Sequence, residues 1–384
     1  MAWGTVNVDD QRMQFVILAS RRETTMKQLC EQFEISRPTG YAWVQRYRMG
    51  GVAAVAEKSR RPRRSPMRTE AEIEQRVVRL RQQRPDWGAR KLRVLLQRQG
   101  VELPAVTVHR ILLRHNLVRA EDRHRAAVLR FQREAPNQLW QMDFKGPVGW
   151  NAPTGPLSVL DDHSRYAIAL ADTGSTRAEP VQERLQEAFT RCGMPEAMLM
   201  DHGTPWWNMQ AASGWTWLTV WLMKQGIQLY LSGYRHPQTQ GKVERFNGAL
   251  EAARRKRGCH AGPVQQPWLD AFRQEYNYER PHQALGMKTP GSLWHRSERR
   301  YQVNPPAWEY ASGAEVHRLG SQGQLHVQGR RWEISKALAQ QCVQLIRVEE
   351  RILVYYCRSL VRELDPPRQR STAVDRWRGG TPKV

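Results

Sequence analysis

The pattern of apolar and polar positions changes twice along the chain and divides it into three regions. Up to about residue 115, apolar side chains recur at helical spacing. From Asn137 they come in short β-like runs separated by helical stretches, and beyond Pro305 only short alternating runs remain. The expected fold is therefore multidomain: all-α modules first, an α/β domain next and a small β domain last. The expected boundaries are 1–57, 58–69, 70–125, 132–300, 308–366 and 367–384.

The first region predicts two groups of three helices. They span residues 12–22, 26–33 and 36–50 in the first group, and 70–83, 89–99 and 104–115 in the second. Each group ends in two helices joined by a short turn, which is the arrangement of a helix-turn-helix DNA-binding domain. Polar and basic residues on the last helix of each group are the expected DNA contacts: Arg37, Thr39, Tyr41, Arg46, Thr107, His109 and Arg110. A plain helical bundle with solvated arginines is the alternative.

The net charge makes a polyanion the expected partner. The chain has 60 Lys and Arg against 37 Asp and Glu, a formal charge of +23. Fifty of the basic residues are Arg, whose planar guanidinium binds phosphate through two parallel hydrogen bonds. Residues 1–133 carry +15, residues 134–243 carry −2 and residues 244–384 carry +10. We therefore expect chemistry in the middle region, and double-stranded DNA held by the regions on either side.

The segment from Lys58 to Arg68 is a run of basic residues interrupted by two prolines. It cannot form a core of its own, so it is either a solvated linker or an arm that lies along phosphates or in a minor groove. In the second case its arginines bind DNA: Arg60, Arg61, Arg63 and Arg64.

Composition and spacing exclude several classes of protein. No apolar run approaches the roughly 18 residues of a membrane span, and the first 40 residues lack a signal-peptide pattern. The five cysteines are scattered and form neither a C-x-x-C pair nor a Cys/His group, which argues against a disulfide framework and a structural zinc site. We expect a cytoplasmic protein with no membrane partner.

The middle region has the element order of a ribonuclease-H-like α/β core: three strands, then helix, strand, helix, strand and helix. Asp143 lies in the first strand, Asp201 ends the fourth, and Glu244 is in the first turn of the last helix. The first and fourth strands are neighbours in such a core, so these carboxylates are expected to converge. Three converging carboxylates supply the oxygen ligands for two Mg²⁺ ions, for which Mn²⁺ can substitute.

Taken singly, each of these acids also has an ordinary structural interpretation. An Asp in a strand is commonly an edge or turn residue, and a Glu at a helix start interacts with the helix dipole. Asp161 and Asp162 are competing acids in the next hairpin, and we interpret Asp162 as a turn residue.

Five ordered segments resemble the integrase-core DDE transposases of bacterial insertion sequences, which are relatives of retroviral integrase. They are WQMDFKG from Trp140, LDDHSRY from Leu160, DHGTP from Asp201, HPQTQGKVERFN from His236 and YNYERPHQAL from Tyr276. The resemblance implies that Asp143, Asp201 and Glu244 are the metal ligands. It also fits the single-frame members of the group, which carry paired helix-turn-helix domains, and implies a bacterial protein associated with the nucleoid.

Two features depart from the family pattern. Between Asp201 and Glu244 lie 42 residues, more than is usual, and the excess falls where tryptophans gather: Trp206, Trp207, Trp215, Trp217 and Trp221. This segment is either an enlarged loop with a buried helix face or a stacking or subunit-contact surface. Seven positions after Glu244, where the family often has a basic residue, this chain has Glu251.

Basic residues near the three acids are further expected DNA contacts. The contact that Glu251 cannot make has either moved to Arg254 or Arg255 or been lost. The remaining expected contacts around the site are Lys145, Lys242 and Arg245.

The last region predicts a small β domain. Short alternating runs begin near Val316, Gln324, Cys342 and Arg351, with glycines between some of them. The resemblance implies a five-stranded barrel of the SH3-like kind, and the tail after Pro366 is expected to be disordered. Two arginines in this region, Arg330 and Arg331, either contact DNA or lie on a solvated surface.

The leading hypothesis is a DNA transposase that binds the terminal inverted repeats of its element, cleaves the ends and joins the 3′-OH ends to target DNA. No protein nucleophile is needed, because water and then the 3′-OH attack phosphorus in line. Insertion joins two ends to two target strands, so a homo-oligomer of at least two protomers is expected. The alternatives are a domesticated DNA-binding regulator with an inactive core, and a nuclease for junctions or RNA strands.

Overall fold

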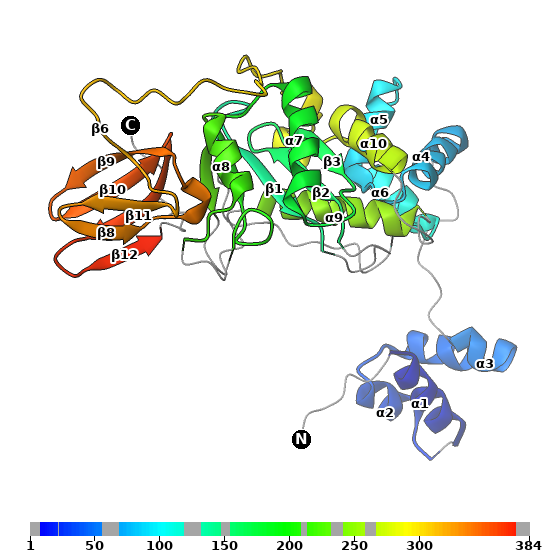
Figure 1. The fold of residues 1–384 in the computed structure, drawn as a ribbon. Helices are drawn as coiled ribbons and strands as arrows, with labels where there is room; N and C mark the ends of the chain where they lie inside the picture. Colours follow the sequence, from blue (N-terminus) through cyan, green and yellow to red (C-terminus); the bar gives the residue numbers. More distant parts are fainter. Residues whose placement is uncertain are drawn as a thin grey trace. The chain divides into compact units, whose positions relative to one another are not determined.

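The computed structural model describes residues 8–21, 23–55, 69–118, 132–146, 154–208, 213–231, 241–257 and 266–373 (Figure 1). The chain divides into two compact units, Met1–Thr69 and Glu70–Val384. Most of the expected basic linker lies outside the described residues, including Arg60, Arg61, Arg63 and Arg64. Within the described ranges, no helix combines the length and the apolar character needed to cross a membrane.

The first unit is a three-helix module in which α1 spans Val8–Arg21, α2 Met26–Gln32 and α3 Arg37–Val55. Helix α2 begins with a reciprocal capping box. The hydroxyl of Thr25 accepts a hydrogen bond from the backbone of Gln28, whose side chain accepts one from the backbone of Thr25. The two helices after this cap are joined by a short turn, as the sequence predicts.

Glycines determine two features of helix α3. A Cβ at Gly40 would lie 2.7 Å from the Phe15 ring and 2.8 Å from the Cys30 sulfur, so the close packing of α3 on the module core requires glycine there. The predicted helix stop at Gly50 and Gly51 is present as a break in helical dihedral angles, with φ of +62° at Gly51. The prediction was too short at this point, because one more helical turn follows, to Val55.

The second unit begins with another three-helix module: α4 spans Ala71–Gln83, α5 Ala89–Arg98 and α6 Ala105–Arg114. Trp87, in the turn before α5, is completely buried against apolar side chains from all three helices. The predicted second group of helices is therefore confirmed, with boundaries that differ by one residue or so.

The core that follows is a five-stranded mixed sheet. Its strands are β1 (Trp140–Phe144), β2 (Leu157–Asp161), β3 (Ala167–Ala171), β4 (Ala197–Met200) and β5 (Gln228–Leu231), in the spatial order β3-β2-β1-β4-β5. The first three strands pair antiparallel, whereas β4 runs parallel to both β1 and β5. This is the strand order of the predicted ribonuclease-H-like core, and it makes β1 and β4 neighbours.

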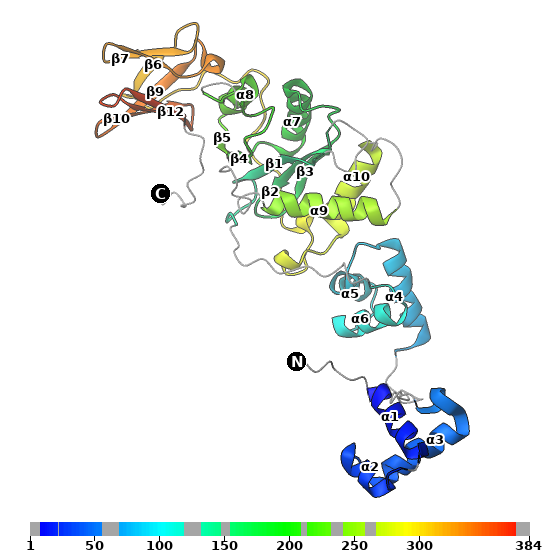
Figure 2. The ribbon, with the colours of Figure 1, turned by 90° about the horizontal axis from the view of Figure 1, so that it is seen from below.

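Helices cover both faces of this sheet (Figure 2). The helices are α7 (Ala178–Cys192), α8 (Trp217–Lys224), α9 (Gly241–Lys256) and α10 (Gln266–Gln274). Apolar residues of α7 and α8 pack with Trp140 and Met142 of β1, whereas those of α9 and α10 pack with Leu160 of β2. Side chains alternate between the faces of a strand, so Gln141 and Asp143 of β1 lie on the side covered by α9.

Over residues 308–373, the structure describes β-strands and short turns of helix. The strands are β6 (Glu315–Arg318), β7 (Gln324–Val327), β8 (Arg330–Glu333), β9 (Cys342–Val348), β10 (Arg351–Tyr356), β11 (Ser359–Asp365) and β12 (Arg370–Ala373). Five of them form an antiparallel sheet in the order β12-β11-β10-β9-β6, and β7 and β8 form a separate hairpin.

This arrangement corrects two expectations. Between residues 308 and 373 the structure describes seven strands instead of five, and they pair as an open sheet plus a hairpin, so a closed SH3-like barrel is not established. The expectation of disorder from residue 367 was wrong for residues 367–373, because β12 pairs antiparallel with β11 from Arg362↔Ala373 to Asp365↔Arg370. This edge strand is polar, so apolar alternation did not reveal it.

Candidate active site

Two adjacent strands and one helix bring the three predicted acids toward one edge of the sheet. In the parallel pairing of β1 and β4, Gln141 lies opposite Leu199. Continuing that register by two residues places Asp143 beside Asp201, which directly follows β4. Glu244 lies in the first turn of α9, where the buried Val243 and Phe246 fix the helix on the sheet.

Asp143 and Glu244 line the same open cavity of about 400 Å³. The other lining residues are Phe144, Lys145, Gly146, Asn247, Gly248, Glu251, Ala252 and Arg255. Two of the predicted DNA-binding cations, Lys145 and Arg255, therefore lie beside the two acids. A cavity lined by both carboxylates and cations suits a phosphodiester, so this cavity is the candidate active site.

The electrostatics connect the third acid to this cavity. Burial raises the pKa of Asp143 to about 7, and the neighbouring carboxylates of Asp201 and Glu244 add to the rise. Burial also raises the pKa of Glu244. Asp201 does not line the cavity, but it is close enough to Asp143 to disfavour a second negative charge.

Asn247 holds Asp143 and was missed in the sequence. Its Nδ2 donates to Oδ2 of Asp143 at 3.1 Å, and its own Oδ1 accepts from the hydroxyl of Ser158 at 2.7 Å. Ser158 lies directly opposite Asp143 in the β1–β2 pairing. The available signal was position: Asn247 follows Glu244 by three residues, so both lie on one side of α9.

The donor chemistry of the three acids fits Mg²⁺, which prefers carboxylate oxygens. Burial, and after it the neighbouring carboxylates, raise the pKa of Asp143, and a bound cation would offset both effects. Within the described part of the chain, however, no three His, Cys, Asp or Glu side chains form a group that could hold a metal ion. The structure thus provides carboxylate ligands at one end of the neighbouring strands β1 and β4, but these carboxylates are not arranged as a complete metal site.

The two competing acids have structural roles. Asp161 accepts hydrogen bonds from the backbones of Asn137 and Ser164 and from the Ser164 hydroxyl. Asp162 is fully buried and accepts from Gln141 at 2.8 Å and from the backbone of Arg133 at 2.7 Å. The interpretation of Asp162 as a structural residue of the turn is therefore confirmed.

Asp162 is also the partner of Lys242, one of the predicted DNA contacts. Lys242 was expected to contact DNA, but its ammonium forms an ion pair with the buried Asp162 carboxylate and donates to the Asp162 carbonyl at 3.1 Å. Burial lowers the pKa of Lys242 to about 8. This lysine fixes the start of α9 to the hairpin after β2, so its charge is used inside the protein.

The other predicted DNA contacts differ in their accessibility. On the last helix of each helical module, five of the predicted contact residues are exposed: Arg37, Tyr41, Arg46, His109 and Arg110. Thr39 and Thr107 are half-buried. On α9, Arg245 and Arg255 are exposed. Arg254 is buried and pairs with Glu251 at 2.7 Å, so its charge has a partner within the protein.

The tryptophan-rich segment is mostly buried. Trp206, Trp207 and Trp215 belong to the main core, and the indole of Trp215 donates to the carbonyl of Val361 in β11. Trp221 stacks on Phe189, and only Trp217 is substantially exposed. Of the two alternatives, the enlarged and buried loop is confirmed for the first three residues.

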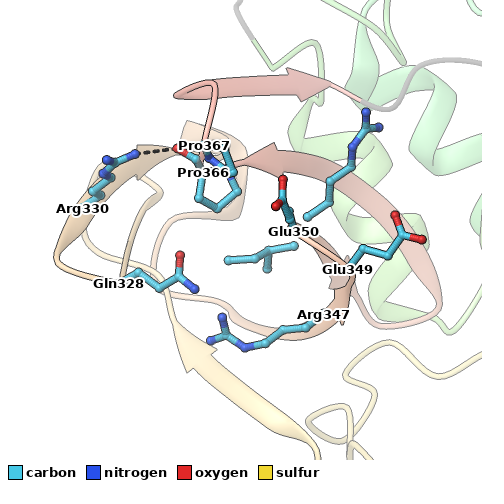
Figure 3. Close-up of a pocket in the computed structure, with 9 residues that line it drawn as sticks. Gln328, Arg330, Arg347, Glu349, Glu350, Pro366 and Pro367 are labelled. Atoms are coloured by element: carbon cyan, nitrogen blue, oxygen red, sulfur yellow. Dashed lines mark hydrogen bonds between the residues drawn. The ribbon is translucent and has the colours of Figure 1, made fainter.

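A second cavity of about 400 Å³ lies in the C-terminal β region and shares no residue with the first (Figure 3). Both signs of charge line it, and its arginines have partners within the protein. Arg330 donates to the carbonyl of Pro366, Arg347 pairs with Glu315 and Arg351 pairs with Glu363. The arginine charges here are largely compensated by the protein itself.

Comparison with known proteins gives matches to four families. The description "Integrase core domain" applies to residues 133–237 in one family and 225–290 in another. Upstream, residues 11–63 match a "Helix-turn-helix domain" family and residues 39–112 a "Homeodomain-like domain" family. The integrase matches cover the strands and the helix that carry the three acids.

Two relatives come from bacterial insertion elements. A 31.7 kDa protein of insertion element IS407 from Burkholderia multivorans is 27% identical over 244 residues, which cover 60% of this chain and 83% of the relative. A 39.2 kDa protein of insertion element IS476 from Xanthomonas euvesicatoria is 26% identical over 254 residues, covering 63% and 70%.

Among solved structures, the catalytic core domain of HTLV-2 integrase in complex with magnesium matches 42% of this chain and 99% of its own, at 14% identity and a TM-score of 0.34. Similarity at this level is too low to support a conclusion about this chain. The fold assignment therefore rests on the strand order and register of the sheet.

Proposed function

Because this chain belongs with the integrase-core proteins of insertion elements, we propose that it is the DNA transposase of such an element. It binds the terminal inverted repeats, cleaves the element ends and joins the resulting 3′-OH groups to target DNA. The observation that carries the proposal is the cavity shared by Asp143 and Glu244, with Asp201 near enough to raise the pKa of Asp143.

Asp143, Asp201 and Glu244 are the proposed ligands of two Mg²⁺ ions. The chemistry that two such ions supply is stabilisation of the charge that develops on the attacking and leaving oxygens of a phosphodiester. The chain's own contribution is orientation: Asn247 holds one oxygen of Asp143 at 3.1 Å. Lys145 and Arg255 line the same cavity and are the proposed contacts to the phosphate groups that flank the reacting one.

The proposed reaction consists of two displacements at phosphorus. In the first, water attacks an end phosphodiester, the bond to the 3′ oxygen breaks and the element end is released with a 3′-OH. In the second, this hydroxyl attacks a target phosphodiester, one P–O bond forms, one breaks, and a target 3′-OH leaves. Neither step requires a nucleophilic side chain.

The helical modules are the proposed readers of the terminal repeats. The exposed residues on α3 and α6 have the chemistry for this role, because Arg binds phosphates and guanine edges while Tyr and His add stacking and hydrogen bonds. We also propose that the C-terminal β region is an SH3-like domain that contributes to DNA binding.

At least two protomers are proposed to act together. One active site attacks one phosphodiester at a time, whereas insertion joins two element ends to two target strands. A homo-oligomer assembled on paired ends meets this requirement, with double-stranded DNA as the other partner.

The test uses the full-length protein and a plasmid that carries the two ends of its own element. With Mg²⁺, strand breaks at the ends and joined products in a second DNA are expected, and EDTA should abolish both. Specific binding of the ends without cleavage in either Mg²⁺ or Mn²⁺ would overturn the proposal in favour of a DNA-binding regulator.

A further inference from the structure

Trp206 touches both strand ends that carry the catalytic aspartates. Its indole N–H donates to Oδ1 of Asp201 at 2.5 Å, and its ring stacks on Phe144 with centroids 5.4 Å apart and an interplanar angle of 16°. Phe144 directly follows Asp143 in β1, and Asp201 directly follows β4. Trp206 is 1% exposed, so the surrounding core holds this geometry in place.

The hydrogen bonds of Asp201 are unevenly distributed over its two oxygens. Oδ1 accepts from Trp206 and also from the backbone N–H of Gly203 at 2.9 Å. Among the residues that the structure describes, Oδ2 accepts no hydrogen bond. A carboxylate held in this way cannot rotate freely, and it presents one oxygen to a ligand.

Gly203 is part of the same arrangement. A Cβ at this position would lie 2.9 Å from Oδ1 and 3.0 Å from Oδ2 of Asp201, closer than ordinary van der Waals contact. The chain therefore turns tightly around the carboxylate, and any side chain at residue 203 would have to displace it. This gives a second, independent way to disturb Asp201 without changing the acid itself.

We propose that Trp206 is a positioning residue, which orients Asp201 through its N–H and fixes the spacing of Asp143 and Asp201 by stacking on Phe144. The inference rests on the proposed function, because it assigns Asp201 to a divalent-cation site. The free Oδ2 is then the oxygen offered to the cation. Groups that orient metal ligands from behind typically contribute about 10- to 100-fold to metal affinity.

The alternative is a purely structural role, in which Trp206 only fills space in the core. Trp206→Phe separates the two roles, since a phenyl ring can still stack on Phe144 but has no N–H for Asp201. Trp207→Phe is the matched control: Trp207 is also buried in the core and packs edge-on against Trp215, with ring centroids 5.1 Å apart, without bonding a carboxylate.

The experiment measures Ca²⁺ binding to the full-length protein by calorimetry without DNA, so that no turnover occurs. Trp206→Phe should weaken Ca²⁺ binding about 10-fold, and Trp207→Phe should leave it within about twofold of wild type. In end cleavage, Trp206→Phe should need about 10-fold more Mg²⁺ for the half-maximal rate, yet approach the wild-type rate at saturating Mg²⁺.

Three outcomes decide the matter. Unchanged Ca²⁺ affinity and Mg²⁺ dependence in a folded Trp206→Phe protein would overturn the positioning role while leaving the proposed function intact. If Trp206→Phe unfolds, Gly203→Ala takes its place and should weaken Ca²⁺ binding to a similar degree; wild-type affinity in that variant would overturn the role equally. A wild-type protein that binds no divalent cation and cleaves no ends would remove both proposals.

Discussion

Acidic side chains lie near both ends of helix α9. Those near its start have other carboxylates as neighbours, whereas the one near its end has arginines. At its start, Glu244 and Asp143 share a cavity, and the pKa of Asp143 is raised to about 7 by burial and by neighbouring carboxylates. At its end, Arg257 pairs at 2.7 Å with Asp86 of the second helical module, and Arg280 pairs with the same acid at 2.6 Å. Burial alone would raise the pKa of Asp86, but the two guanidinium groups outweigh it and lower the pKa.

The difference separates two uses of a carboxylate. Asp86 is fully buried and compensated by the protein, so its ion pairs serve to hold the second helical module against the core. Burial and mutual repulsion both disfavour the ionised acids of the cavity, and protonation or a bound cation relieves them. The same distinction applies to the basic residues, where Lys242 and Arg254 are used internally and Arg255 is not.

Removing the charge of Asp143 should abolish most of the catalytic activity. Asp143→Asn keeps the shape of the side chain but removes a charge that the proposed metal site needs, so cleavage of the ends should fall about 1,000-fold, equivalent to several kcal/mol. Binding of the ends should be nearly unchanged. Glu251→Gln is the control, because Glu251 lines the same cavity but pairs with Arg254, and it should retain most activity. Full cleavage by Asp143→Asn would remove the assignment.

Asp86, whose charge is compensated by two arginines, should contribute to the free energy of unfolding and not to catalysis. Asp86→Ala leaves the buried Arg280 without its carboxylate, and breaking a buried pair in this way costs about 3–5 kcal/mol. Denaturant unfolding of the full chain measures the loss. Glu187→Ala, which removes an exposed partner of Arg184, should cost less than about 1 kcal/mol. Equal losses in the two variants would mean that the Asp86 pairs do not hold the module.

The two acids should also give opposite dependences on pH in metal-free protein. A raised pKa means that folded Asp143 keeps its proton up to about pH 7, whereas the unfolded chain releases it near pH 4. Stability contributed by this group therefore falls as pH rises through that window. Asp86 has a lowered pKa, so its contribution is present above about pH 4 and is lost below it.

Thermal unfolding of Asp143→Asn tests the first half of this statement. The variant should melt about 2 to 4 °C above wild type at pH 8, which corresponds to roughly 1 kcal/mol, and at the same temperature as wild type near pH 4. Saturating Mg²⁺ should abolish the advantage at pH 8 by stabilising only the wild type. A variant that is less stable than wild type at pH 8 would contradict the repulsion.

Local patterns in the sequence predicted the N-terminal helices and the succession of core strands and helices up to α9, but not helix α10. Apolar spacing identified the six N-terminal helices, and the motif context singled out Asp143, Asp201 and Glu244, which the structure brings toward one edge of the sheet. Strand β12 was missed because it is polar and pairs at an edge, so its position depends on β11 and not on its own apolar residues.

Partners at long range could not be predicted. Lys242 was predicted to contact DNA. Its partner in the structure, Asp162, lies 80 residues away in the sequence, so the pairing could not be seen from the local sequence. The same holds for Asn247 with Ser158, separated by 89 residues, and for Arg257 with Asp86, separated by 171. The residue type predicts which interactions a side chain can make. The tertiary fold determines whether another side chain of the protein already occupies it.

Exposure and internal pairing also distinguish individual arginines. Arg37 is exposed at the start of α3, whereas Arg254 is buried and paired with Glu251. If exposure marks the charges that are left for DNA, Arg37→Ala should weaken binding of the terminal repeats a few-fold and reduce the salt slope of log Kd by about one, because one fewer counterion is released. Arg254→Ala should leave both the affinity and the slope unchanged, even though it removes the same formal charge. Fluorescence anisotropy at several salt concentrations measures both quantities for the full-length protein. If the two variants lost affinity and slope equally, net charge alone would govern binding, and internal pairing would not distinguish structural from DNA-binding arginines.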